Sequence, residues 1–307
     1  MFEAFEVGPF LIWTRLVFML LGIWLSVEFF LRLARSANLS LSDFQEHPWR
    51  YTLTFALAGR LFAILAEYRV YLKDPLQMIF ITDGRFSFLG GAIGIGTVLF
   101  FATKNQRSTF LQWLDVLLPA ACFGLFFGWL GSFFSGQAYG NPTDMFWGVS
   151  YELMSVRYTV PIHPVQLYYA LFYFFLTFLL LVIRKKAKRV GAETLCGIFF
   201  ASLATFIFES FRGDFGIPVF ATRMDFVLMI ILFLSLGIFA AVELKVSERA
   251  MLVYQATLLL VFTVYVFLRP HLPFATFQLR FSQLLAILAI LATTVYVVIH
   301  RRKYPHL

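Results

Sequence analysis

The chain has 307 residues, of which 60% are hydrophobic and only 14% are charged, and its formal net charge is +8. A composition this apolar, with 40 phenylalanines, excludes a soluble globular protein and indicates an integral membrane protein. The positive charges cluster between apolar runs, so they do not indicate nucleic-acid binding.

Nine apolar runs are predicted to be membrane-spanning helices, because ~20 helical residues cross a hydrocarbon core about 30 Å thick. Lipid cannot satisfy backbone hydrogen bonds, so runs of this length favour helices over other structures. We therefore expect an all-α polytopic membrane protein. In chain order the nine runs are 10–33, 51–67, 87–103, 113–133, 165–183, 195–211, 225–244, 251–268 and 282–300.

Basic residues follow the first, third, fifth, seventh and ninth runs, including the sequence "RKKAKR" at Arg184–Arg189. Cytoplasmic loops of membrane proteins carry such an excess of lysine and arginine. The pattern therefore predicts an N-terminus outside the membrane and a C-terminus in the cytoplasm. The first run lacks a basic segment before it and a small-residue cleavage site, so we interpret it as a retained helix.

Two outward-facing segments, 66–94 and 135–169, hold most of the polar residues outside the basic clusters. The second contains the turn formers Gly140-Asn141-Pro142 and the β-branched run Val156–Val160. These features predict a small extramembrane cap at about 134–164 with some strand structure. A binding function and a purely structural role both fit such a cap.

Ionisable residues occur inside two predicted spans. Arg60 lies in the second, whereas Glu209 and Arg212 lie three residues apart near the end of the sixth. A pair at this spacing can be purely structural. Alternatively, Arg212 and Arg60 bind an anionic head group, because a guanidinium offers phosphate a planar two-pronged contact. Arg15, near the outer end of the first span, is expected to extend toward the interface.

His163 precedes Pro164 at the start of the fifth span and is followed by Gln166 and Tyr168. A histidine at a helix start is often a hydrogen-bonding cap. Its imidazole also titrates near neutral pH, so at the outer interface it can take up a proton or bind a phosphate oxygen.

Several sequence words occur in a defined order. That order and spacing resemble the prolipoprotein diacylglyceryl transferase family over roughly residues 8–245. The words are "GR" at Gly59-Arg60, "DGRFSFLGGAIG" at Asp83–Gly94, "GWLGSFFSGQAYG" at Gly128–Gly140, "HPVQLYY" at His163–Tyr169 and "FESFRGDF" at Phe208–Phe215.

The resemblance implies transfer of the diacylglyceryl group of phosphatidylglycerol to the lipobox cysteine thiol of an exported prolipoprotein. The reaction would take place at the outer face of the bacterial cytoplasmic (inner) membrane, without a cofactor or a metal ion. The expected catalytic residues are Arg212, His163 and Glu209. The expected substrate-binding residues are Arg60, Ser87, Gly90, Gly91, Gly131, Gly136, Gln137, Gln166 and Tyr168.

The chain departs from the family pattern at two ionisable positions. Leu89 stands where the family has a histidine, and Trp129 stands where it has an arginine. Two further polar positions differ, at Ser132 and Gln137. Residues 246–307, predicted to form two more helices, have no recognised counterpart, so we expect a transferase-like domain at 1–245 and a separate C-terminal addition.

Two other functions fit the same residues. A catalytically impaired paralogue would keep the lipid slot and bind a phospholipid, a lipopeptide or a partner protein. A related enzyme would catalyse a different lipid or envelope transfer on the same scaffold. Leu89 and Trp129 favour these alternatives, because neither side chain carries a charge or accepts a proton. Similarity over most of the chain favours the diacylglyceryl transferase.

Overall fold

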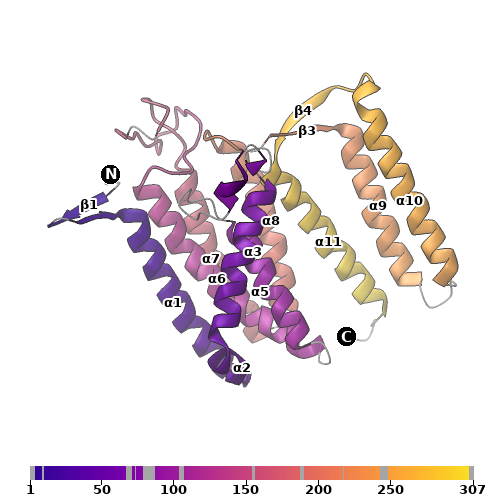
Figure 1. The fold of residues 1–307 in the computed structure, drawn as a ribbon, viewed down its shortest axis with the longest axis horizontal. Coiled ribbons are helices and arrows are strands. Elements are labelled where there is room, and N and C mark those ends of the chain that lie inside the picture. Colours follow the sequence, from indigo (N-terminus) through magenta and orange to yellow (C-terminus); the bar gives the residue numbers. More distant parts are fainter. Residues whose placement is uncertain are drawn as a thin grey trace. The chain divides into compact units, whose positions relative to one another are not determined.

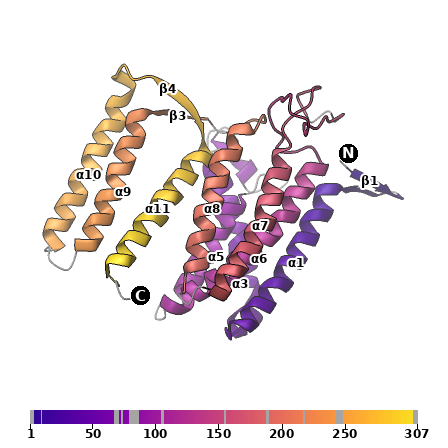
Figure 2. The same ribbon diagram turned by 180° about the vertical axis from the view of Figure 1, so that it is seen from behind.

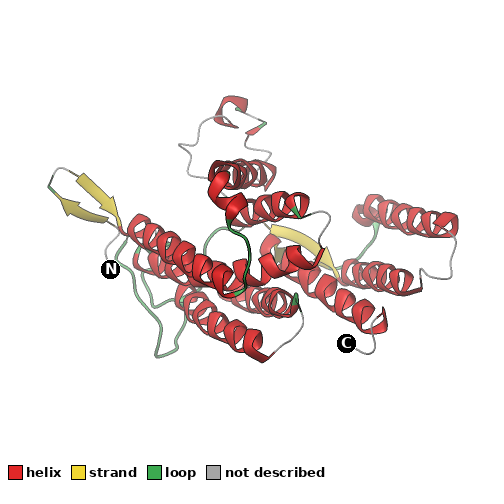
Figure 3. Ribbon diagram, turned by 90° about the horizontal axis from the view of Figure 1, so that it is seen from below, coloured by secondary structure: helices red, strands yellow, loops and turns green. Residues whose placement is uncertain are grey.

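A computed structural model describes residues 4–8, 10–66, 71–72, 74–78, 87–103, 107–153, 156–186, 190–216, 218–242 and 248–303. These residues are predominantly helical (Figure 1 and Figure 3). Their strands form two antiparallel pairs, β1 (Ala4–Val7) with β2 (Phe10–Trp13) and β3 (Pro218–Thr222) with β4 (Thr276–Arg280). Apart from these two short strand pairs, the predicted helical architecture is confirmed for the described residues.

Each predicted run overlaps one long helix. The long helices are α1 (Thr14–Ser36), α3 (Pro48–Ala66), α5 (Phe88–Ala102), α6 (Arg107–Phe134), α7 (Val165–Lys186), α8 (Ala192–Phe208), α9 (Arg223–Val242), α10 (Glu248–Leu268) and α11 (Phe281–Lys303). The short ones are α2 (Ser42–Glu46), η1 (Pro75–Met78), η3 (Glu209–Phe211) and η4 (Arg269–His271).

Five segments of the described chain are long and apolar enough to cross a membrane. They are Thr14–Ser36, Phe110–Phe134, Val165–Lys186, Ala192–Phe211 and Phe281–Ile299. Leu89–Ala102 and Ala256–His271 are apolar but shorter.

The chain forms two compact units, and their boundaries fall inside helices. The first unit comprises Met1–Ile23, Cys122–Leu180 and Leu195–Leu307, and the second comprises Trp24–Ala121 and Leu181–Thr194. The first unit therefore contains the 135–164 segment and everything from α9 to the C-terminus. The second contains α3, α5 and the first half of α6.

In the second unit, α3 and α5 approach closely because α5 presents glycines to α3. A side chain at Gly90 would overlap Phe62, and one at Gly91 would lie 2.5 Å from the ring of Phe55. The buried carboxylate of Asp115 accepts hydrogen bonds from the backbone N–H groups of Gly191 (2.5 Å) and Thr194 (2.9 Å). This carboxylate satisfies the free N–H groups at the beginning of α8.

In the first unit, the 135–164 segment differs from the prediction. Its described residues form isolated bridges, in which Pro142 and Val149 pair with Ile162, and the predicted strand at Val156–Val160 is a series of bends. Pro142 and Pro161 lack the N–H groups that a continuous strand ladder needs. An apolar cluster holds the segment together instead, with Phe133, Tyr139, Tyr151, Val156 and Ile162 buried.

The C-terminal elements of the first unit form a connected group. Strand β3 pairs with β4 so that Pro218 lies opposite Arg280, and α9 lies between α10 and α11 (Figure 2). Asp225, in the first turn of α9, accepts a hydrogen bond from the hydroxyl of Tyr265 (2.8 Å) and pairs with Arg269 (2.9 Å). The ends of α9 and α10 are joined through this carboxylate.

Two glycines of α5 provide a matched test of this packing. A methyl group at Gly94 would lie 2.5 Å from the Cβ of Ala58, whereas one at Gly96 would meet no atom within 4 Å. We expect Gly94→Ala to lower the free energy of unfolding by about 1–3 kcal/mol through overpacking. Gly96→Ala should be neutral or stabilising by up to about 1 kcal/mol, because alanine favours helix. Equal melting temperatures for the two variants in detergent would contradict the close packing.

Candidate functional site

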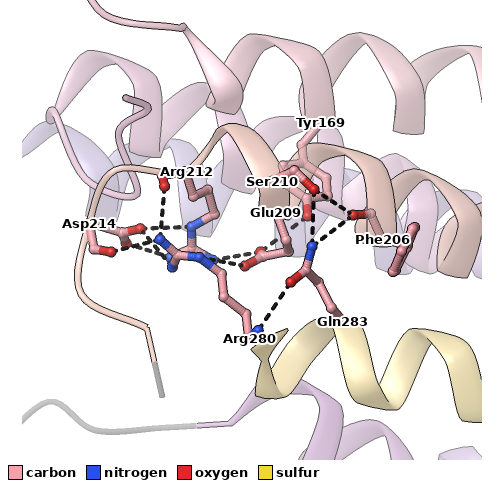
Figure 4. Close-up of polar contacts among 8 residues, drawn as sticks. All are labelled: Tyr169, Phe206, Glu209, Ser210, Arg212, Asp214, Arg280 and Gln283. Atoms are coloured by element: carbon pink, nitrogen blue, oxygen red, sulfur yellow. Dashed lines mark hydrogen bonds and ion pairs between the residues drawn. The ribbon is translucent and has the colours of Figure 1, made fainter. Parts of the chain in front are cut away.

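The end of α8 carries a network of charged side chains (Figure 4). Glu209, only 4% exposed, accepts a hydrogen bond from Nη1 of Arg212 over 2.7 Å. Nε of Arg212 donates to Oδ1 of Asp214 over 2.9 Å, and Nη2 donates to the second oxygen of the same carboxylate. The ion pair expected between Glu209 and Arg212 is therefore present, and Asp214 completes the contacts of the guanidinium.

A second arginine enters this network from β4. Nη2 of Arg280 donates to the carbonyl oxygens of Arg212 (2.8 Å) and Asp214 (2.9 Å). Its Nη1 lies 3.5 Å from Oδ1 of Asp214, and its Nε lies 4.0 Å from Oε2 of Glu209. Two arginines and two carboxylates thus give the network a formal charge of zero.

The charge of Arg212 is stabilised by its surroundings. Burial alone lowers the pKa of this guanidinium, but the hydrogen bonds and negative charges of Asp214 and Glu209 outweigh burial and raise the pKa above its ordinary value. Arg212 is therefore a permanent cation. Its side chain is 20% exposed, so the cation is partly accessible.

An aromatic pair borders the network on the α7 side. Tyr169 donates from its hydroxyl to Oε1 of Glu209 over 3.2 Å. The indole of Trp129 stacks on the Tyr169 ring, with centroids 4.2 Å apart and an interplanar angle of 8°. The position at which the resemblance places an arginine is thus occupied by a stacked aromatic ring.

His163 belongs to a second polar cluster. Its Nδ1 lies 3.0 Å from the hydroxyl oxygen of Tyr168, which also accepts a hydrogen bond from the indole N–H of Trp147 over 2.7 Å. The imidazole packs against Phe211, with ring centroids 5.1 Å apart. Burial lowers the pKa of His163 below its ordinary value, so the neutral imidazole is favoured at neutral pH.

Backbone hydrogen bonds join the two clusters at Gly140. The N–H of Gly213 donates to the carbonyl of Tyr139 (2.9 Å), and the N–H of His163 donates to the carbonyl of Asn141 (2.9 Å). A side chain at Gly140 would overlap the backbone of His163. The glycine therefore lets the loop after α8 and the start of α7 meet the same short segment.

A third polar group surrounds Gln137. Gln166 is fully buried and donates from Nε2 to the carbonyl of Gln137 over 2.7 Å. Nη1 of Arg15 donates to Oε1 of Gln137. Gly136, just before it, has φ +67°, a conformation that favours glycine, whereas Gly131 packs against Phe18 of α1. The structure thus brings Gln137, Gln166 and both glycines together.

The remaining predicted site residues belong to the second unit and have structural contacts there. The guanidinium of Arg60 lies over the Tyr71 ring, 5.3 Å from its centroid. Ser87 is the N-cap of α5 and accepts a hydrogen bond from the N–H of Gly90 over 3.1 Å. The adjacent Leu89 is 52% exposed.

The sequence analysis missed Arg280 and expected Arg15 only to extend toward the interface, whereas the structure brings both arginines into polar clusters. Arg15 reaches Gln137, and Arg280 reaches the Glu209 network. Arg280 is the last residue of the loop "RPHLPFATFQLR", in which a basic residue ends an otherwise nearly uncharged stretch. The position of Arg280 between two apolar runs was the sequence feature from which a polar contact could have been predicted.

Comparison with known proteins supplies the family. The family model for prolipoprotein diacylglyceryl transferase matches residues 3–242. The chain belongs to this family. It is 36% identical over 219 residues to the phosphatidylglycerol–prolipoprotein diacylglyceryl transferase of Azospirillum brasilense, an alignment that covers 68% of this chain and 80% of the relative.

Two other similar proteins carry the same name. The one from Pseudoalteromonas atlantica is 30% identical over 216 residues, which is 68% of this chain and 74% of the relative. The one from Polynucleobacter necessarius is 33% identical over 177 residues, which is 54% of this chain and 64% of the relative. The family match ends at residue 242, so Arg280 lies outside it.

The lowered pKa of His163 predicts a pH dependence of stability. An unfolded histidine titrates near its ordinary pKa of about 6.5, so below this pH the unfolded chain binds a proton that the folded protein binds less readily. Stability due to His163 is therefore present above about pH 6.5 and is lost as the pH falls toward the lower folded-state pKa. In melting experiments, His163→Gln should remove part of this loss, whereas His271→Gln, a change at an exposed histidine, should not. The same acid sensitivity in both variants would contradict the prediction.

Proposed function

We propose that this protein transfers the diacylglyceryl group of phosphatidylglycerol to the lipobox cysteine thiol of exported prolipoproteins. The observation that carries the proposal is the family match over residues 3–242. The outer-end site of the first unit is consistent with it, because a partly exposed guanidinium, a neutral imidazole and the buried amide of Gln166 occur in that unit.

The reaction sets the chemical requirements for the site. The thiol sulfur attacks the glyceryl carbon that bears the phosphate ester, so a sulfur–carbon bond forms and a carbon–oxygen bond breaks. The thiol proton passes to a base, and the bonding electron pair leaves on the oxygen of glycerol phosphate. A base and a cationic site for the leaving anion are the two essential parts.

Arg212 fits the cationic site in this proposal. It is permanently charged, and its planar guanidinium can contact two phosphate oxygens at once. Glu209 holds the guanidinium in place from its buried side, and an incoming phosphate competes with Asp214 for the remaining nitrogens. The sequence resemblance alone, through the word at Gly59-Arg60, is the ground for also proposing Arg60 as a head-group contact.

His163 fits the role of base. The hydroxyl oxygen of Tyr168 has two lone pairs and can accept from both Trp147 and Nδ1 of His163. This arrangement leaves Nε2 as a proton acceptor, and the lowered pKa keeps it unprotonated near neutral pH. His163 would in this way replace the histidine that the family has at the position of Leu89.

The other predicted residues complete the proposed substrate site. Gln137, Gln166 and Tyr168 would orient the head group and the peptide through hydrogen bonds. In the first unit, Gly131 and Gly136 would help to shape the slot for the acyl chains, because each lies in close contact with neighbouring side chains. Ser87, Gly90 and Gly91 are proposed for the same role from the sequence resemblance alone; within the second unit they form the start of α5 and its contact with α3.

We further propose nine spans in the bacterial cytoplasmic membrane, with the N-terminus outside and the C-terminus in the cytoplasm. The alternating basic clusters support this orientation. The segment at about 134–164 would then be an outer-face cap. The family-like domain would extend over 1–245, with two further helices in 246–307.

Complementation tests the proposal directly. In a bacterial strain depleted of its own diacylglyceryl transferase, the protein should restore lipobox thiol modification, detected by mass spectrometry. Arg212→Gln should reduce modification by about a hundredfold or more, as expected for a lost charged contact to the reacting group. The control Arg157→Gln changes an exposed arginine of the 135–164 segment and should leave modification unchanged.

Two outcomes would contradict the assignment. Absence of modification despite confirmed membrane insertion of the parent protein would exclude the proposed activity. Full modification by Arg212→Gln would exclude Arg212 from the phosphate site.

A further inference from the structure

The charge of Arg212 alone does not give the end of α8 a net positive charge that would bind an anion. Each of the three nitrogens of its guanidinium donates to a carboxylate, Nη1 to Glu209 and the other two to Asp214, and the three residues together carry a formal charge of −1. A phosphate approaching this triad meets excess negative charge. Some further positive group must compensate before Arg212 can bind an anion.

The geometry points to Arg280 as a positioning residue that neutralises the acidic partners of Arg212 and so allows Arg212 to bind an anionic phospholipid head group. Arg280 approaches both carboxylates that bind Arg212, at 3.5 Å for Asp214 and 4.0 Å for Glu209. It brings the formal charge of the network from −1 to zero. When a phosphate takes the outward nitrogens of Arg212, Asp214 keeps a cationic partner in Arg280.

The contacts of Arg280 are specific. Its Nη2 donates to two carbonyl oxygens of the 212–214 turn, at 2.8 and 2.9 Å, so the guanidinium also fixes the turn that carries Asp214. Gly216 lies directly against this guanidinium, and a side chain there would overlap Nη1. The loop after Asp214 is therefore shaped to accept the Arg280 side chain.

The C-terminal segment holds Arg280 in this place through its own backbone. The antiparallel register of β3 with β4 sets Arg280 opposite Pro218. Oε1 of Gln283 accepts from the Arg280 N–H over 3.0 Å, while its Nε2 donates to the Phe206 carbonyl and the Ser210 hydroxyl, both over 3.1 Å. Residues beyond the family match thus contribute directly to the proposed site (Figure 4).

The test compares the binding of an anionic and a zwitterionic phospholipid. Purified full-length protein in detergent micelles is titrated with phosphatidylglycerol and, separately, with zwitterionic phosphatidylcholine. Arg280→Gln should weaken phosphatidylglycerol binding about tenfold, the size of one charge-assisted contact, with phosphatidylcholine binding unchanged. Asp214→Asn on top of Arg280→Gln removes the excess negative charge and should restore binding to within about threefold of the parent.

The matched control is Arg269→Gln, which removes an arginine of the same C-terminal segment that pairs with Asp225 instead. It should leave phosphatidylglycerol binding unchanged. If Arg280→Gln fails to fold, Asp214→Asn alone provides the test, and its binding should equal or exceed that of the parent. Weaker phosphatidylglycerol binding by Asp214→Asn would overturn the inference.

Two results for Arg280→Gln would also overturn it. One is unchanged phosphatidylglycerol binding. The other is an equal loss for both lipids that Asp214→Asn does not restore, which would make Arg280 a structural contact only.

The inference rests on the proposed function, and the two can fail separately. A parent protein that binds phosphatidylglycerol without modifying lipobox thiols contradicts the function and leaves the Arg280 comparison intact. An active parent whose Arg280→Gln variant binds the lipid equally well contradicts the inference alone.

Discussion

The rest of this site depends on a buried carboxylate, Glu209, at the end of the apolar helix α8. Glu209 is 4% exposed, and a buried charge without partners costs several kcal/mol by general estimates. The structure supplies Arg212 at 2.7 Å, the Tyr169 hydroxyl at 3.2 Å and Arg280 at 4.0 Å. Arg212 also contacts Asp214, so each charged side chain in the network lies beside one of opposite sign.

The loop segment around Gly140 connects the charged network at the end of α8 to His163, the proposed base. The hydrogen bond from Gly213 to Tyr139 and the one from His163 to Asn141 attach the turn after α8 and the start of α7 to the same short segment. A shift of the turn after α8 would therefore also change the position of the His163 imidazole. This backbone connection explains why an irregular segment, held by a buried aromatic cluster, stands at the centre of the site.

Features fixed by local sequence could be predicted, and those fixed by distant pairing could not. Helix positions follow from apolar runs, and the Glu209–Arg212 ion pair follows from a three-residue spacing. Arg280 reaches Asp214 across 66 residues, through a strand register that no local pattern encodes. The strand expected at Val156–Val160 is a series of bends, and the isolated bridges of the 135–164 segment lie elsewhere, where Pro142 and Val149 pair with Ile162.

The register of β3 with β4 also has a consequence for biosynthesis. A ribosome completes Asp214 well before Arg280, and the earlier part of a chain begins to fold first. Until Arg280 has been synthesised, Arg212 is the one arginine of this network that Glu209 and Asp214 can contact. The network becomes electrically neutral only when β4 brings Arg280 to it. A chain that terminates before Arg280 therefore differs from a finished one in the charge of its site as well as in its length.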